Sequence, residues 1–153
     1  MAKTTLDGVE GVLAAVGQHL GASDWLEITQ ERVDQFAEAT NDHQWIHVDV
    51  ERATRESPFG GPIAHGYLTL SLVSSMVGEI VEASGFLMGV NYGAEKIRFP
   101  SPVPVGARVR ASATLDEATP FEGGVQMNLG VTIEFEGQTK PALAAAILFR
   151  RYV

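Results

Sequence analysis

The hydrophobic pattern of the chain changes near its middle. In the first half, apolar residues recur at intervals of three and four, the spacing that places side chains on one face of an α-helix. In the second half, apolar and polar residues alternate, which is typical of β-strands with one buried face. The order of the two patterns predicts helices followed by a sheet, which is an α+β arrangement.

Residues 7–20 have the pattern of an amphipathic helix. Asp7 and Glu10 stand at the spacing of a capping box, and Gly21 provides a stop. The apolar positions of this segment share one stripe: Val9, Val12, Leu13, Val16 and Leu20. We therefore expect a helix within residues 1–21 that covers the core.

The next segment combines a short strand with two helical stretches. Residues 25–28 are predicted to form the strand, after which Thr29 caps a helix that ends near Thr40. Asp49 is expected to cap one further turn of helix. Residues 57–62 are too rich in proline and glycine for regular structure, so a loop is expected there.

Residues 66–81 are predicted to form the central helix. Their apolar side chains cover most of the helix circumference, and a helix of that kind is buried. One narrow stripe is small and polar: Tyr67, Ser71, Ser74 and Gly78. This stripe either lines a cavity or contains serines that bond backbone carbonyls one turn back.

The second half predicts four long strands. They are residues 88–99 with a bulge at Gly93, 107–115, 125–135 and 142–149. The last is apolar on both faces, so it is expected to be a central strand. Turns are expected at 119–124 and 136–138, and Pro100, Pro102 and Pro104 are expected to interrupt pairing between the first two strands. The sheet must wrap around the central helix to bury it.

Composition narrows the class of protein. A chain of 153 residues is expected to form one domain, residues 1–153, with a core that needs no cross-links. It has no cysteine, which excludes disulfides and thiolate zinc sites. With 19 acidic and 11 basic residues the net charge is -8, which disfavours a nucleic-acid partner. There is no signal-peptide pattern and no apolar run of about 18 residues, so a cytoplasmic protein with no membrane partner is expected.

The best candidate for chemistry is the stretch from residue 40 to residue 72. It contains three of the four histidines, and Asp42, His43 and His47 lie within six residues of one another. Histidine has the side-chain pKa nearest to neutral pH. Imidazoles beside a carboxylate therefore favour proton-transfer chemistry.

The same residues have simpler interpretations. Asp42 is equally suited to forming a turn after the preceding helix. His43 and His47 are four apart, so on a helix they would share one face and suggest a metal site. However, Trp45 and Ile46 give this segment β-like character, and no third ligand has a recognisable spacing. We therefore expect no metal and no cofactor.

The order helix, Asp-x4-His, loop, Ala-His-Gly, buried helix and long strands resembles the MaoC-like, or R-specific, enoyl-CoA hydratases. That family has the hotdog fold, a long antiparallel sheet wrapped around a central buried helix. Residues 40–49 and the sequence Arg-Phe-Pro-Ser-Pro-Val at 98–103 are similar to its nodulation protein N-like branch. The resemblance covers residues 24–153.

The family signature is Gly-Asp, any residue, Asn-Pro, an aliphatic residue and His. Here it becomes Asn41-Asp42-His43-Gln44-Trp45-Ile46-His47. Asp42 and His47 keep the family spacing, whereas Asn41 and Gln44-Trp45 depart from it, which puts the orientation of the pair in question. The resemblance implies reversible addition of water to trans-2-enoyl-CoA to give (R)-3-hydroxyacyl-CoA, with Asp42 and His47 as the catalytic pair.

The resemblance also implies that the backbone N–H of Gly66 bonds the thioester carbonyl. Hydration independently requires a base for water, an acid for C2 and a donor to the enolate oxygen. Asp42 and His47 are suited to the first two tasks, and the sequence does not show which is the base. Gly66 at the helix N-terminus is suited to the third.

The candidate substrate contacts are Ser74, Tyr67 and His65. Ser74 is implied by the resemblance, while His65 is better explained as a helix-entry residue bonded to nearby backbone. Phosphates of CoA need local cations, and the candidates are Lys96, Arg98, Arg108 and Arg110. Arg98 would alternatively anchor the proline-rich loop. A homodimer is expected because a single hotdog domain leaves one sheet edge open.

Two other functions fit the fold. A hotdog acyl-CoA thioesterase would aim a carboxylate at the carbonyl carbon. A non-catalytic acyl-CoA or acyl-carrier binding subunit would need no Asp-x4-His pair. Two buried ionisable groups are costly unless they are used, which disfavours the non-catalytic function.

Overall fold

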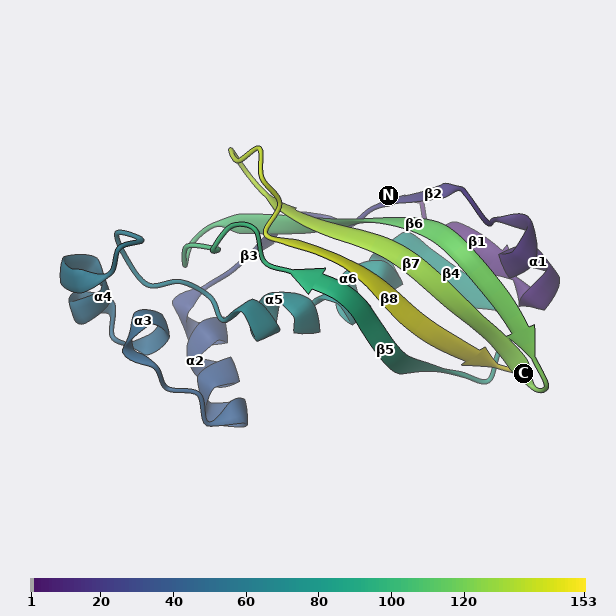
Figure 1. Ribbon diagram of the computed structural model, residues 1–153, viewed down its shortest axis with the longest axis horizontal. Helices are drawn as coiled ribbons and strands as arrows, with labels where there is room; N and C mark the ends of the chain where they lie inside the picture. Colours follow the sequence, from purple (N-terminus) through teal and green to yellow (C-terminus); the bar gives the residue numbers. More distant parts are fainter. Residues whose placement is uncertain (1) are drawn as a thin grey trace.

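The computed structural model describes residues 2–153, and its elements follow the predicted order of helices before a long sheet (Figure 1). In chain order they are β1 (Thr4–Asp7), α1 (Gly8–Ala14), β2 (His19–Ala22), β3 (Leu26–Glu27), α2 (Gln30–Thr40), α3 (Trp45–Val48), α4 (Val50–Glu56), α5 (Gly66–Ser71), α6 (Val73–Ile80), β4 (Val81–Ser84), β5 (Met88–Arg98), β6 (Arg108–Phe121), β7 (Gly124–Phe135) and β8 (Leu143–Tyr152).

The main sheet has the strand order β2-β6-β7-β8-β5, and β3 also pairs with β6. All of its pairs are antiparallel. β8 lies between β7 and β5, which confirms the prediction of an interior strand from its two apolar faces. The bulge predicted at Gly93 is confirmed by a register shift between Asn91 and Gly93.

Two predictions about the sheet are wrong. β5 does not pair with β6 but lies at the opposite side of the sheet, so the proline-rich segment connects strands that are not neighbours. The turn expected at 119–124 is shorter, because β6 continues to Phe121 and β7 begins at Gly124. The turn at 136–138 is confirmed, with Gly137 at a φ of 85°.

The central helix consists of α5 and α6, which join at the helical residue Leu72. It packs one apolar face against the concave side of the sheet: Leu68, Leu72, Val73, Met76, Val77 and Ile80. The predicted small and polar stripe is exposed, so burial of nearly the whole circumference is wrong for the single chain. Ser71 donates to the carbonyl of Tyr67, as the backbone-bonding alternative predicts, whereas Ser74 donates to Asn91 Oδ1 at 3.0 Å.

The helix expected over residues 7–20 is limited to α1, Gly8–Ala14. Asp7 belongs to β1, which pairs in parallel with β4, and its carboxylate accepts a bond from Ser84 Oγ instead of capping the helix. Gly17 has a φ of 89°, a conformation that ends helical geometry. The capping-box pattern predicted the position of this helix but not its length.

Helices α2, α3 and α4 lie beyond one end of the sheet, beside the start of α5 (Figure 1). Thr29 caps α2 by accepting a bond from the N–H of Arg32, and Asp49 caps α4, so both capping predictions are confirmed. The β-like character predicted near Trp45 is wrong, because this segment forms the helical turn α3. Within residues 2–153, no helix is long and apolar enough to cross a membrane.

Candidate active site

A cavity of about 340 Å³ lies at the N-terminus of α5. Its lining combines residues of the α3–α5 segment with the proline-rich segment: His47, Phe59, Ile63, Ala64, Gly66, Thr69, Phe99, Ser101, Pro102, Val103 and Ala142. Most of these side chains are apolar. His47 and the backbone of Gly66 therefore face an environment that excludes much of the water.

His47 is buried, with 6% of its surface exposed. Its Nδ1 lies 2.7 Å from the carbonyl oxygen of Ile63, so Nδ1–H donates and Nε2 carries the free lone pair. Burial lowers the pKa of His47 below 6.5, and the nearby His65 lowers it further, while the bond to Ile63 and the charge of Asp42 oppose the change. The ring is therefore neutral at neutral pH and able to accept a proton.

His65 holds His47 and the backbone of Asp42 in place. Its ring stacks on that of His47 with 3.9 Å between centroids, and Phe36 packs against it at 4.9 Å. His65 Nε2 lies 3.0 Å from the carbonyl oxygen of Asp42, a bond in which the ring donates. His65 therefore lies at the entry to α5 and bonds the backbone, as expected. It is not among the residues that line the cavity.

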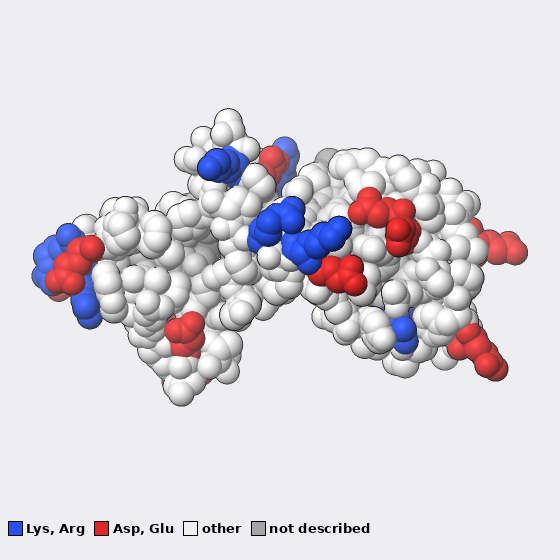
Figure 2. Space-filling model, viewed as in Figure 1, with Lys and Arg blue, Asp and Glu red and all other residues white. Residues whose placement is uncertain are grey.

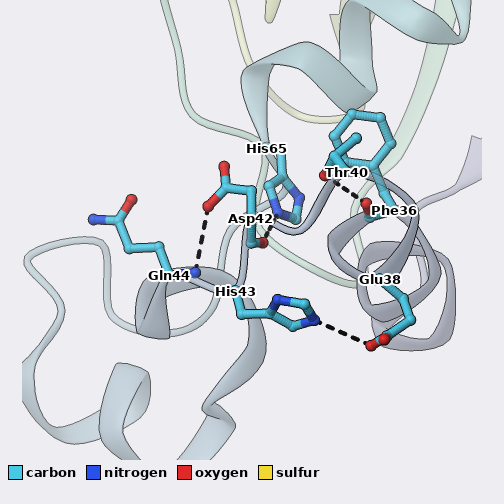
Figure 3. Close-up of polar contacts among 7 residues, drawn as sticks. All are labelled: Phe36, Glu38, Thr40, Asp42, His43, Gln44 and His65. Atoms are coloured by element: carbon cyan, nitrogen blue, oxygen red, sulfur yellow. Dashed lines mark hydrogen bonds and ion pairs between the residues drawn. The ribbon is translucent and has the colours of Figure 1, made fainter.

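Asp42 follows the left-handed residue Asn41, which ends α2 at a φ of 61°. One carboxylate oxygen lies 3.4 Å from the N–H of Gln44, a long contact typical of a turn (Figure 3). The carboxylate also lies within 4.8 Å of ring nitrogens of His47 and His65. Both members of the pair were expected to be buried. His47 is buried, but Asp42 is exposed, so the expectation is wrong for Asp42.

His43 points away from this group. Its ring lies 3.1 Å from Glu38 in an exposed pair, as Figure 3 shows. α3 begins at Trp45, after His43, so a metal site on one helix face with His43 and His47 is wrong. Within residues 2–153, the group with suitable spacing for a metal is Asp42, His47 and His65, and each ring keeps one nitrogen that is not bonded to a carbonyl.

Gly66 provides the first N–H of α5, and this N–H has no hydrogen-bond partner within the described chain. A Cβ at this position would lie 3.3 Å from the ring of Phe99, closer than most side chains tolerate. Glycine therefore keeps the cavity open where its backbone donor is exposed.

The remaining predicted substrate contacts lie elsewhere. Tyr67 is 70% exposed and meets Phe99 edge to face. Ser74 lines other cavities farther along the central helix, with Asn91. Within one chain, the structure places Asp42 beside His47, and His47 and Gly66 line the same cavity, whereas Ser74 lies elsewhere.

Two of the four predicted phosphate-binding cations are already paired. Arg108 forms two bonds with Glu136, which raise the pKa of Arg108 and lower that of Glu136, and Arg110 pairs with Glu134. Lys96 and Arg98 form no ion pair within residues 2–153 and line a groove of about 280 Å³. On the face drawn in Figure 2, acidic and basic side chains lie interspersed, without a large basic surface.

Sequence reasoning missed several groups that shape the cavity. Phe99 restricts access to Gly66, and the carbonyl of Ile63 fixes the tautomer of His47. Phe99 follows Arg98 in a segment that already resembled the nodulation protein N-like branch, which was a usable signal. A backbone carbonyl has no sequence signal, because every residue has one.

The fold and this site define a hotdog domain with a carboxylate–imidazole pair at the start of its central helix. The family model described as "MaoC like domain" matches residues 12–135. The chain is 47% identical over 147 residues to 3-hydroxyacyl-thioester dehydratase Z of Mycobacterium tuberculosis, covering 95% of this chain and 97% of that protein. It is 48% identical over 140 residues to nodulation protein N of Rhizobium leguminosarum bv. viciae, covering 88% and 84%.

Among solved structures, the (R)-hydratase from A. caviae involved in PHA biosynthesis superposes with a TM-score of 0.71 at 25% identity. The match covers 88% of this chain and 94% of that one. The chain therefore belongs to the MaoC-like dehydratase domain family, and its hotdog fold is confirmed.

Proposed function

We propose that the protein is an R-specific enoyl-CoA hydratase, which adds water to trans-2-enoyl-CoA and runs in reverse as a 3-hydroxyacyl-thioester dehydratase. The observation that carries the proposal is the buried His47, with its free Nε2 beside Asp42 and with the unpaired N–H of Gly66 on the same cavity. The dehydratase name of the 47% identical relative supports the same reaction class. The unit that carries it is a single domain, residues 1–153.

In the proposed mechanism His47 is the base. Nε2 takes a proton from water as the water oxygen forms a bond to C3 of the enoyl thioester. The C2–C3 π electrons move toward the thioester, and the N–H of Gly66 stabilises the resulting enolate oxygen. His47 then returns the proton to C2, so the sum of the steps is addition of one water.

The environment of His47 suits both halves of this cycle. Its lowered pKa keeps it neutral before reaction and makes the protonated ring a strong donor to C2 afterwards. The negative charge of Asp42 favours the protonated ring, so it stabilises the intermediate state while its oxygens orient the water. Asp42 and His47 thus act on one water as a unit.

The deciding experiment supplies a short trans-2-enoyl-CoA and its saturated analogue to the purified protein. Loss of the double bond without release of free CoA thiol is expected, together with formation of the (R)-3-hydroxy product. Thiol release from the saturated analogue would establish a thioesterase instead. Binding of both without either reaction would establish a non-catalytic acyl-CoA binding subunit.

The CoA end of the substrate is proposed to contact Lys96 and Arg98. Neither forms an ion pair within residues 2–153, although Asp116 lines the same groove, and Arg98 precedes Phe99, a lining residue of the active-site cavity. Replacing both by glutamine should raise KM for an enoyl-CoA, while kcat changes little. Replacing Arg108 and Arg110 serves as the matched control, because their charges are already neutralised by Glu136 and Glu134.

We further propose a homodimer that joins through β5. Within residues 2–153 this strand pairs with one other strand, β8, and every residue from Met88 to Arg98 is exposed. Large apolar side chains are concentrated on and beside it: Leu87, Met88, Val90, Tyr92 and Ile97. A second copy of the chain would cover this edge. Light scattering at micromolar concentration should give twice the chain mass, and an active monomer would contradict the proposal.

A further inference from the structure

Two adjoining cavities run along the exposed stripe of the central helix. The first, of about 330 Å³, lies between Leu70–Ser74 and β5, and the second, of about 320 Å³, shares Ser74 and Asn91 with it. Gly89, Phe149 and Arg151 complete the second cavity. Because the cavities share residues, they form one groove, called here the helix groove.

The helix groove begins one helical turn from the active site. Leu70 follows Gly66 by four residues, which places both on the same face of the helix. Ser74 follows Gly66 by eight residues, or about 12 Å along the axis. A ligand whose thioester is bound at Gly66 would therefore reach Ser74 by following the exposed face of this helix for about two turns.

Hydrogen-bond donors dominate the far end of the groove. Ser74 Oγ donates to Asn91 Oδ1, which leaves the two N–H donors of the Asn91 amide unused. Arg151 Nε is buried and has no hydrogen-bond partner, and Arg151 forms no ion pair within residues 2–153. Among the described residues, no acidic side chain lines either cavity.

The position of the Arg151 side chain depends on the neighbouring strand β5. Gly89 pairs with Arg151 in the sheet, and a Cβ at Gly89 would overlap the guanidinium. The neighbouring Arg150 contrasts with this arrangement, since it bonds Gln126 and lies 3.6 Å above the ring of Tyr92. Of two adjacent arginines, only Arg151 is directed into the groove without a protein partner.

We propose that the acyl chain of the substrate occupies the helix groove and ends in a carboxylate that is bound by Arg151 and Asn91. This inference rests on the proposed function and specifies its substrate class as thioesters of dicarboxylic acids. A carboxylate accepts two parallel bonds from a guanidinium, whereas a methyl end leaves the buried Arg151 Nε unsatisfied. Unpaired polar groups in a site reject an analogue more strongly than a change in apolar size does.

The test compares two series of trans-2-enoyl-CoA substrates of increasing length, one ending in a carboxylate and one in a methyl group. At the chain length that reaches Arg151, kcat/KM should favour the carboxylate by roughly ten- to a hundredfold. In Arg151→Met this preference should be lost. The ratio is measured within one preparation, so a partly unfolded variant does not alter it.

Two further variants separate position from charge. Gly89→Ala keeps the guanidinium but displaces it, and should reduce the preference as well. Arg150→Met removes the adjacent cation outside the groove and should leave the preference unchanged. Equal use of both series by the unmodified protein, or a preference that survives Arg151→Met, would overturn the inference.

Failure of the proposed function has a different signature. The shortest enoyl-CoA does not reach Arg151, so its hydration tests the site at Gly66 alone. If it is hydrated while no length shows a preference for the carboxylate, the inference about Arg151 fails and the hydratase stands. If neither series is hydrated at any length, the proposed function itself fails.

Discussion

Polar groups of different kinds lie beside the two ends of the central helix. At its start, Asp42 and His47 include groups that accept protons, next to the donor N–H of Gly66. Along its exposed stripe, Asn91 and Arg151 offer donors without a titrating acceptor beside them. The first arrangement is able to exchange a proton with a bound ligand. The second is able to bind a ligand through hydrogen bonds but not to exchange a proton with it.

The largest expected effect comes from removing the proton-exchanging groups. Asp42→Asn keeps the shape of the side chain but removes its charge, and His47→Ala removes the base. Each should reduce turnover of an enoyl-CoA by roughly 10²- to 10⁴-fold, and Asp42→Asn should do so with little change in melting temperature. The double variant should lose less than the product of the two factors, because the pair acts on one water.

His43→Gln is the matched control for these variants. It removes an imidazole from the same stretch, but His43 is exposed and paired with Glu38. Its turnover should equal that of the unmodified protein. If Asp42 only forms a turn, Asp42→Asn would instead be fully active, and only removal of the side chain would cost about 1 kcal/mol of stability.

The next largest effect tests the donor at the start of the helix. Gly66→Pro removes the N–H at the first helical position, where proline is tolerated, and His65 before it is already extended. A loss of about 10²- to 10³-fold in kcat is expected. Gly66→Ala retains the N–H and only crowds Phe99, so a smaller loss in Gly66→Ala than in Gly66→Pro identifies the donor as the cause.

A smaller effect concerns pH. The pKa of His47 is lowered below 6.5, mainly by burial. When the pH is lowered, kcat/KM should therefore decrease only below pH 6.5, where the base becomes protonated. Asp42→Asn removes a charge that raises this pKa, so the remaining activity should show the same fall at lower pH. An unmoved or upward-shifted profile would exclude His47 as the group that titrates.

The same shift predicts the pH dependence of stability. The folded protein favours neutral His47, so this contribution to the free energy of unfolding is complete above pH 6.5 and is lost as pH falls through the folded pKa. Urea unfolding of the unmodified protein and of His47→Gln at several pH values measures it. The difference in pH dependence between the two should be confined to the region below 6.5.

No effect on turnover is expected from removing metal ions. Asp42, His47 and His65 have a spacing that a metal ion would accept, yet the proposed mechanism uses the proton-accepting nitrogen of His47 directly. Dialysis against a chelator should therefore leave turnover unchanged. A loss of activity that added zinc or another divalent ion restores would replace the acid–base comparison with a metal centre.

The sequence by itself determined the local features of this protein. Capping residues and apolar spacing located α2, α4 and the central helix. Alternation located β6 and β7, and a run that is apolar on both faces located β8. The bulge at Gly93 and the Asp42–His47 spacing were also visible in the sequence. These features depend on residues within one or two turns, or along one strand, so a local pattern contains the information needed to predict them.

Contacts between distant segments were decided only by the tertiary structure. The parallel pairing of β1 with β4 shortened the first helix, and β5 joined β8 instead of β6. The stacking of His47 on His65 and the direction of Arg151 into the helix groove depend on which elements become neighbours. A period of two assigns a side chain to a face of its strand but does not identify the partner strand, because pairing depends on the packing of the whole chain.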